Sequence, residues 1–119
     1  MESEAPPHDL SRRTLTFAVR VVRMVGALPK TMEAGVIGKQ VLRSGTSVGA
    51  NYREANRARS KAEFVAKVGD CLKELDETAY WMDLIVETGQ CPATTLADLR
   101  DECHQLLAIF TAISKKAKS

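Results

Sequence analysis

The chain has 119 residues, with 17 Lys and Arg against 15 Asp and Glu, 45% hydrophobic residues and only 5% aromatic residues. This length fits one domain rather than two, and it is sufficient to bury a hydrophobic core. The apolar fraction is too high for a disordered chain, and no apolar run approaches the roughly 20 residues of a membrane span. Few Gly and Pro, with Ala, Leu and Val set among Lys, Arg and Glu, favour helices over strands.

The net charge of +2 conceals an uneven distribution along the chain. Residues 1–61 contain eleven Lys and Arg against five Asp and Glu, whereas residues 62–119 contain six against ten. The two balances are +6 and −4, which indicates a charged face rather than an even surface. Three widely spaced cysteines without a C-x-x-C motif, and an acidic start without an apolar signal segment, predict a reduced, cytoplasmic protein.

The first helical pattern is expected to follow a short tail. Residues 1–8 contain two prolines and predict a disordered segment, ahead of a single domain over residues 9–119. The helical pattern runs from Asp9 to Leu28 and stops before Pro29. Apolar residues cover about half of the helix circumference, and four arginines share an arc of about 100° on the other side. These arginines are Arg12, Arg13, Arg20 and Arg23.

A second helix is expected to begin near Thr31 or Glu33 and to end near Ala58. Its centre, from Ser44 to Ala50, consists almost entirely of small residues, and each Gly costs about 1 kcal/mol of helix propensity relative to Ala. Because something must offset this cost, we expect a neighbouring helix to approach closely there, in preference to a break in the helix. The expected buried stripe is Val41, Gly45, Val48, Tyr52 and Ala55.

Two further helices complete the pattern. The segment Ser60-Lys61-Ala62-Glu63 has the sequence of a capping box, so a third helix is expected from there to about Thr88, before Gly89. A fourth helix is expected to begin at a cap on Thr94 or Thr95 and has apolar residues at spacings of three and four. Four helices with short connections predict an all-α fold, an antiparallel up-down four-helix bundle.

Patterns for catalysis and metal binding are incomplete in this chain. The two histidines, His8 and His104, lack the Glu three residues earlier that di-metal bundles use. Cys103-His104 with Cys91 lacks an evident fourth zinc ligand. The run over residues 35–39 has neither the spacing nor the Ser/Thr of a phosphate-binding loop, and we interpret it as a helix-packing segment. We therefore expect no enzymatic activity, no metal and no cofactor.

Two carboxylates fall close to the predicted buried stripes. Glu54 and Glu74 need partners if they are buried, and Arg43 and Asn51 are the candidate partners, with Ser47 on the same polar stripe. We interpret these five residues as a structural polar network rather than as an active site.

The strongest functional pattern is basic. Basic residues repeat at four-residue intervals on the second predicted helix and continue into the next turn, as a phosphate-binding surface requires. The alternative is a solvated face that the acidic third helix neutralises through Asp70, Glu74, Glu77 and Asp83. Aromatic residues for base stacking are missing, so any binding is expected through shape and phosphate. The candidate nucleic-acid-binding residues are Arg12, Arg13, Arg20, Arg23, Lys39, Arg53, Arg57, Arg59 and Lys61.

The apolar surface exceeds what one small bundle can cover. The first helix has a wide apolar side, and the third helix is apolar nearly all round in its last two turns. Such excess predicts a partner surface, and we expect self-association. The candidate interface residues are Phe17, Met24, Trp81 and Leu84.

The segment from Val41 to Ala55, followed by Ser60 and the Glu63-Phe64 pair, resembles a known family. It is similar to small bacterial four-helix bundle proteins first noticed as reading frames inside 23S ribosomal RNA intervening sequences. Their pattern is approximately L-R-R-S-A-x-S-I-x-A-N-I-A-E-G. This chain departs from it with Arg53 in place of Ala and Ala55 in place of Gly.

The resemblance implies an assembly and a set of partners. Similar accessory proteins of diversity-generating retroelements form pentameric barrels and bind a reverse transcriptase and nucleic acid. The expectation is therefore a non-enzymatic homo-oligomer, a pentamer, that presents a basic surface to RNA or DNA as an accessory protein. Its partners are then other copies of itself, a nucleic acid and a reverse transcriptase or another protein, without a membrane. The alternative is a protein–protein interaction scaffold with no nucleic-acid role.

Overall fold

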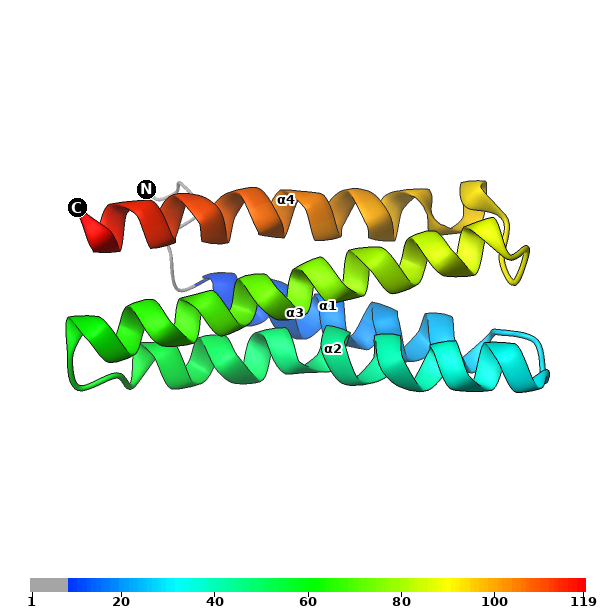
Figure 1. Cartoon of the computed structure of the whole chain (residues 1–119), viewed down its shortest axis with the longest axis horizontal. Coiled ribbons are helices and arrows are strands. Elements are labelled where there is room, and N and C mark those ends of the chain that lie inside the picture. Colours follow the sequence, from blue (N-terminus) through cyan, green and yellow to red (C-terminus); the bar gives the residue numbers. More distant parts are fainter. Residues whose placement is uncertain (1–8) are drawn as a thin grey trace.

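The computed structural model describes residues 9–119, and the expected tail over residues 1–8, including His8, lies outside the described residues. Four helices follow in chain order: α1 (Asp9–Gly26), α2 (Met32–Asn56), α3 (Lys61–Glu87) and α4 (Ala93–Lys118). Successive helices run in opposite directions (Figure 1). The all-α fold and the antiparallel up-down order that the sequence predicts are confirmed.

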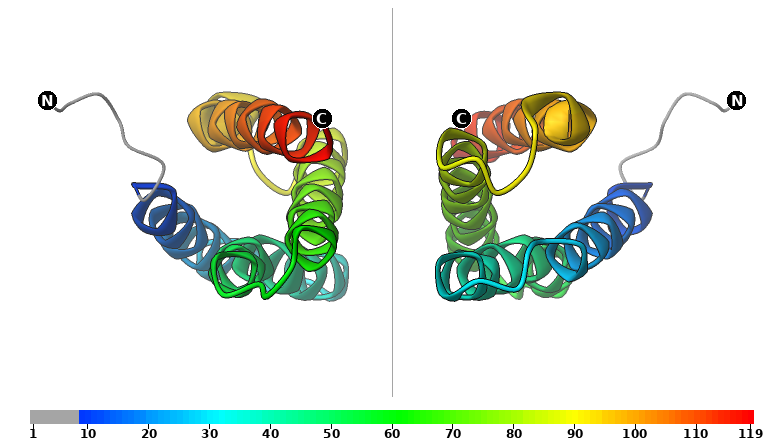
Figure 2. Two further views of the ribbon diagram at one scale, coloured as in Figure 1. Left: turned by 90° about the vertical axis from the view of Figure 1, so that its left-hand side faces the viewer. Right: turned by 90° about the vertical axis from the view of Figure 1, so that its right-hand side faces the viewer.

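The helices follow one another around an open arc. Viewed along the bundle, α1 and α4 form the two ends of this arc, with α2 and α3 between them (Figure 2). Each helix packs against its neighbours in the sequence, α2 and α3 most extensively, whereas α1 and α4 contact each other least. The α1–α4 edge is therefore the least closed part of the bundle.

The start and the end of α3 agree with the sequence. Ser60 is its N-cap, and the Oγ of Ser60 accepts the backbone N–H of Glu63 at 3.0 Å. The carboxylate of Glu63 accepts the backbone N–H of Arg59, one residue earlier than an ideal capping box predicts. After Thr88, Gly89 adopts a φ of +75°, a left-handed conformation that glycine adopts without strain.

The start of α4 differs from the expectation. The helix begins at Ala93 with Pro92 as its N-cap, and no side chain caps its first amides. Thr94 and Thr95 lie inside the helix, so the predicted threonine cap is wrong. Pro92 has a φ of −63° and a ψ of 145°, the extended conformation of an N-cap residue.

The small residues in α2 allow a close helix contact. The helix is continuous from Ser44 to Ala50. A Cβ atom added to Gly45 would lie 2.9 Å from both Cγ atoms of Val21, and one added to Gly49 would lie 3.0 Å from the Oγ1 of Thr14. The predicted close approach of a neighbouring helix is confirmed, and that helix is α1.

The core lies inside the arc and receives side chains from all four helices. Tyr52 of α2 and Phe110 of α4 make an edge-to-face contact with ring centroids 5.5 Å apart. A buried pair of hydroxyl groups, Ser44 and Thr78, joins α2 to α3 at 2.7 Å. Phe17 is completely buried in this core, so its predicted place in an interface between subunits is corrected.

Within residues 9–119, no helix is both long enough and apolar enough to cross a membrane.

Candidate nucleic-acid interface

The predicted polar network divides into separate surface contacts. The guanidinium of Arg43 donates to Glu77 and, at 3.3 Å, to Glu74, which links α2 to α3. The hydrogen bond to Glu77 is the main cause that raises the pKa of Arg43. The predicted partnership between Arg43 and Glu74 is therefore confirmed, although the Arg43 side chain is half exposed rather than buried.

The other members of the predicted network have different partners. Glu54 is exposed, and its carboxylate accepts from the Nζ of Lys67 at 2.6 Å, not from Arg43 or Asn51. The Oγ of Ser47 donates to the backbone carbonyl of Arg43. The five residues do not form one buried network, because Glu54 is exposed and pairs with Lys67 instead.

One candidate of the basic surface is engaged inside the chain. Arg13 of α1 donates to both carboxylate oxygens of Glu102 on α4, at 2.7 and 2.9 Å, and to the amide oxygen of Gln105 at 2.9 Å. The hydrogen bond to Glu102 is the main cause that raises the pKa of Arg13. Arg13 therefore links the N-terminal half of α1 to α4. The sequence analysis did not predict this contact.

Most of the remaining basic candidates have no carboxylate partner. Within residues 9–119, the acidic side chains of α3 that make ion pairs contact Arg43 of α2 and Arg100 of α4. The predicted alternative, in which acidic α3 neutralises the basic face, holds for Arg43 alone among the basic residues of α1 and α2. Within the same described part of the chain, the basic candidates without an ion pair to Asp or Glu are Arg12, Arg20, Arg23, Lys39, Arg53, Arg57, Arg59 and Lys61.

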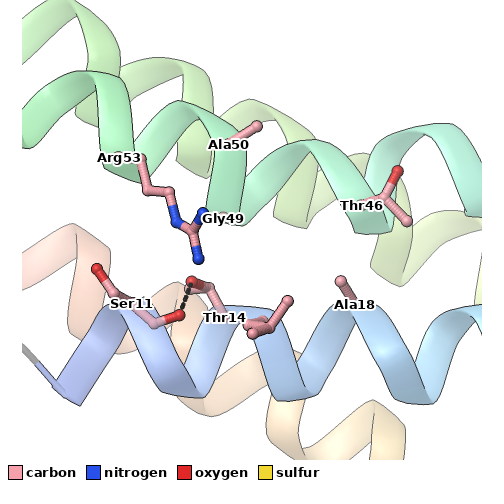
Figure 3. A pocket seen from close by; sticks show the side chains of 8 residues that line it. Ser11, Thr14, Ala18, Thr46, Gly49, Ala50 and Arg53 are labelled. Carbon is pink, nitrogen blue, oxygen red and sulfur yellow. Dashed lines mark hydrogen bonds between the residues drawn. The ribbon is translucent and has the colours of Figure 1, made fainter.

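These basic residues do not meet at one site. Arg53 extends from α2 across a groove of about 160 Å³ toward Ser11 and Thr14 of α1 (Figure 3). Arg20 and Arg23 line a different groove, between α1 and α4. The positive charge of α1 and α2 is therefore distributed over two sides of α1.

A denser group of positive charges lies at one end of the bundle. The Nζ of Lys61, at the start of α3, donates to the carbonyl oxygen of Ser119 at 3.3 Å, which places the end of α4 beside the turn between α2 and α3 (Figure 1). The exposed basic residues at this end, hereafter the basic end, are Arg57, Arg59, Lys61, Lys115, Lys116 and Lys118. The sequence analysis did not name the three lysines at the end of α4 among its candidates.

The exposed apolar side chains differ in part from those predicted. Met24, Trp81 and Leu84 are only half exposed, and Met24 and Trp81 pack against the core. The edge of the Tyr80 ring contacts Trp81, with ring centroids 5.1 Å apart. The larger exposed apolar residues are Leu15, Val19 and Val22 on α1, Met32 and Val36 on α2, and Tyr80 on α3.

Titratable groups do not assemble into a reactive centre in the described chain. No group of three or more His, Cys, Asp or Glu side chains within residues 9–119 is arranged to hold a metal ion. Burial raises the pKa of the Cys71 and Cys103 thiols to about 12, which keeps them protonated at neutral pH. Both thiols face backbone carbonyls in the core.

The fold and its surface define a small helical bundle whose basic residues are mostly exposed. Residues 8–112 match the family described as 23S rRNA-intervening sequence protein. The chain belongs to this family, as the central segment of α2 predicts.

A crystal structure of a similar protein has the same fold. That protein is described as having unknown function, from the S23 ribosomal protein family of Bacteroides thetaiotaomicron. It is 36% identical to this chain with a TM-score of 0.83, and the match covers 88% of this chain and 97% of that one. A comparison with curated proteins gives no match. Neither the family description nor the description of this crystal structure mentions an enzymatic activity.

Proposed function

We propose that this protein is a non-enzymatic homo-oligomer that binds RNA or DNA through its basic end and acts as an accessory protein in nucleic-acid processing. The observation that carries the proposal is the basic end itself. Six exposed basic residues from two distant parts of the sequence meet there. Phosphate backbones bind such clusters without sequence preference.

The charge pairing inside the chain supports the same conclusion. Acidic residues near the basic end are already engaged, because Glu54 pairs with Lys67 and the carboxylate of Glu63 accepts the backbone N–H of Arg59. The arginine and lysine side chains of the basic end make no ion pair within residues 9–119. Apart from the hydrogen bond between Lys61 and the oxygen of Ser119, phosphates would replace water at these groups without breaking a contact to Asp or Glu.

The binding experiment compares two matched double variants by fluorescence anisotropy with a labelled structured RNA over a salt series. Arg57→Gln with Arg59→Gln removes two charges of the basic end, and we expect about tenfold weaker binding and a shallower salt dependence. Lys30→Gln with Lys73→Gln removes two exposed charges elsewhere, and we expect a change of less than about twofold.

Two results would overturn this function. One is the absence of binding to RNA and to duplex DNA at low salt. The other is an equal loss of affinity in both double variants, because the basic end would then have no special role.

The oligomeric part of the proposal rests on exposed apolar surface. Leu15, Val19 and Val22 are between 38% and 49% exposed along one face of α1, and neighbouring exposed apolar side chains mark a candidate partner surface. The family resemblance implies a pentamer. Light scattering at micromolar concentration should then give five times the chain mass of 13.0 kDa, whereas a monomer mass would contradict self-association.

The exposed apolar face of α1 also favours a second function, a protein–protein scaffold. In that case the arginines of α1 serve assembly rather than nucleic-acid binding. Replacing Arg12, Arg13, Arg20 and Arg23 with Ala would then lower the assembly mass. Under the nucleic-acid proposal the basic end is intact in this variant, so it should keep most of its RNA affinity.

A further inference from the structure

A second feature lies at the end of the bundle opposite the basic end. A groove with a volume of about 390 Å³ opens between the C-terminal half of α1 and the first turns of α4. Its floor consists of Leu28, Leu96 and Leu99, which are almost completely buried, and of the half-buried Met24. This volume lies within the range of pockets that hold small organic ligands.

The structure explains why this part of the bundle stays open. In the N-terminal half of α1, hydrogen bonds join Arg13 to Glu102 and Gln105 of α4. Toward the C-terminal end of α1 no comparable bridge joins the two helices within residues 9–119. Because α1 and α4 are the two ends of the arc (Figure 2), no other helix covers the gap between them.

The wall of the groove carries positive charge. Arg20 is half buried and Arg23 is exposed, and both line the groove from α1. Asp98 lines it from α4, yet it forms no ion pair with either arginine in the described chain.

We propose that this groove binds an amphipathic carboxylate, a molecule with an aliphatic body and one anionic head. The body lies on the leucine floor, and the carboxylate lies between the guanidinium groups of Arg20 and Arg23. Arginine pairs well with carboxylates because its planar group donates two parallel hydrogen bonds. A fully apolar ligand leaves the arginines unused, and a cationic ligand is repelled by them.

A cysteine at the groove provides a direct readout of occupancy. Cys91 lines the groove and is half exposed, whereas Cys71 and Cys103 are completely buried. In the folded protein, a neutral alkylating reagent such as iodoacetamide should therefore modify Cys91 alone. A bound ligand should slow this reaction, and intact mass measurement counts the modified thiols.

The experiment measures the rate of alkylation of the full-length protein against the concentration of sodium dodecanoate, kept below micelle formation. We expect saturable protection, with affinity that rises at least about fourfold for every two added methylenes from octanoate to dodecanoate, because each buried methylene adds to binding. Arg20→Gln with Arg23→Gln should weaken dodecanoate binding about tenfold, whereas Lys30→Gln with Lys73→Gln should change it less than about twofold. Calorimetric titration of the unmodified chain with dodecanoate should give the same affinity as the protection assay.

Three outcomes would overturn the proposal. Equal protection by dodecyltrimethylammonium would show apolar adsorption without recognition of the anion. Absence of protection by dodecanoate would show that the groove does not bind it. Alkylation that slows with protein concentration alone would show that a second copy of the chain covers the groove. None of these outcomes bears on RNA binding at the opposite end of the bundle.

Discussion

Gly45 lies in the middle of α2, where its missing side chain allows α1 to approach. The Cγ atoms of Val21 occupy the place that a Cβ would need, and Val21 is completely buried. Gly69 of α3 has nothing within 4 Å of an added Cβ and is exposed. Replacement by Ala is therefore expected to have opposite effects on stability at the two positions, although both glycines have the same intrinsic helix propensity.

We expect Gly45→Ala to destabilise the chain by about 1–2 kcal/mol, because overpacking of a rigid valine exceeds the gain in helix propensity. Gly69→Ala should stabilise it by about 0.5–1 kcal/mol through helix propensity alone. Urea unfolding followed by circular dichroism gives both values. A stabilising Gly45→Ala would contradict the close contact between α1 and α2.

The two buried thiols make the free energy of unfolding fall as the pH rises through the alkaline range. Burial is the main cause that raises the pKa of Cys71 and of Cys103 from the ordinary value of 9.0 to about 12. Between these values the folded chain binds more protons than the unfolded chain. The contribution to stability is therefore complete below pH 9 and is lost as the pH rises toward 12.

In a Cys91→Ala background, the free energy of unfolding should fall by about 2.5 kcal/mol between pH 8.5 and pH 10 from these two thiols together. Replacing Cys71 and Cys103 with Ala should remove most of this fall, even though it lowers stability at neutral pH. Urea titrations at both pH values measure the difference. The same pH dependence in both proteins would show that the thiols do not cause it.

At the scale of elements, few polar contacts join α1 to α4. Arg13 makes a bidentate contact with Glu102, and the two side chains are 36% and 17% exposed. The Arg100–Asp83 pair between α4 and α3 has a single contact and side chains that are 31% and 53% exposed. Geometry and burial both predict that the Arg13–Glu102 pair contributes more to the free energy of unfolding than the Arg100–Asp83 pair does.

A double-mutant cycle with Arg13→Ala and Glu102→Ala should give a coupling energy of about 1 kcal/mol, which falls at high salt. The corresponding cycle for Arg100 and Asp83 should give about 0.3–0.5 kcal/mol. Equal coupling in the two cycles would mean that the contact between α1 and α4 has no special strength. Urea unfolding of each single and double variant supplies the values.

At the scale of the whole molecule, the exposed apolar face of α1 is the candidate interface between copies of the chain. Val22 lies on this face and is 49% exposed. Thr16 is also exposed and lies about 120° around the same helix from Val22. A charge placed on Val22 would be buried in an interface that uses this face, whereas a charge on Thr16 would remain in water.

We therefore expect Val22→Glu to shift the mass from light scattering toward the 13.0 kDa of one chain. Thr16→Glu, the matched control, should keep the mass of the unmodified protein. Circular dichroism checks that both variants stay helical. An unchanged mass for Val22→Glu would exclude this face of α1 from the interface.

Local sequence signals predicted the helices well and their partners less well. The Ser60 cap depends only on residues next to it in the chain, and that prediction was confirmed. The close contact at Gly45 depends on the absence of a side chain, and that prediction was confirmed as well. Phe17 and Glu54 were assigned incorrectly because helical periodicity places a residue on a face without saying what covers that face. The residues of the basic end could be predicted from the sequence less well than the helices, because they come together only in the folded bundle.

The sequence by itself determined four amphipathic helices, their alternating order and the family to which the chain belongs. The tertiary structure decided which charges meet. Lys116 and Arg59 are 57 positions apart, yet the up-down path brings the end of α4 back to the turn between α2 and α3. Arg13 and Glu102 meet for the same reason. Charges interact over distances in space rather than in sequence, so only the packed bundle separates a neutralised arginine from an available one.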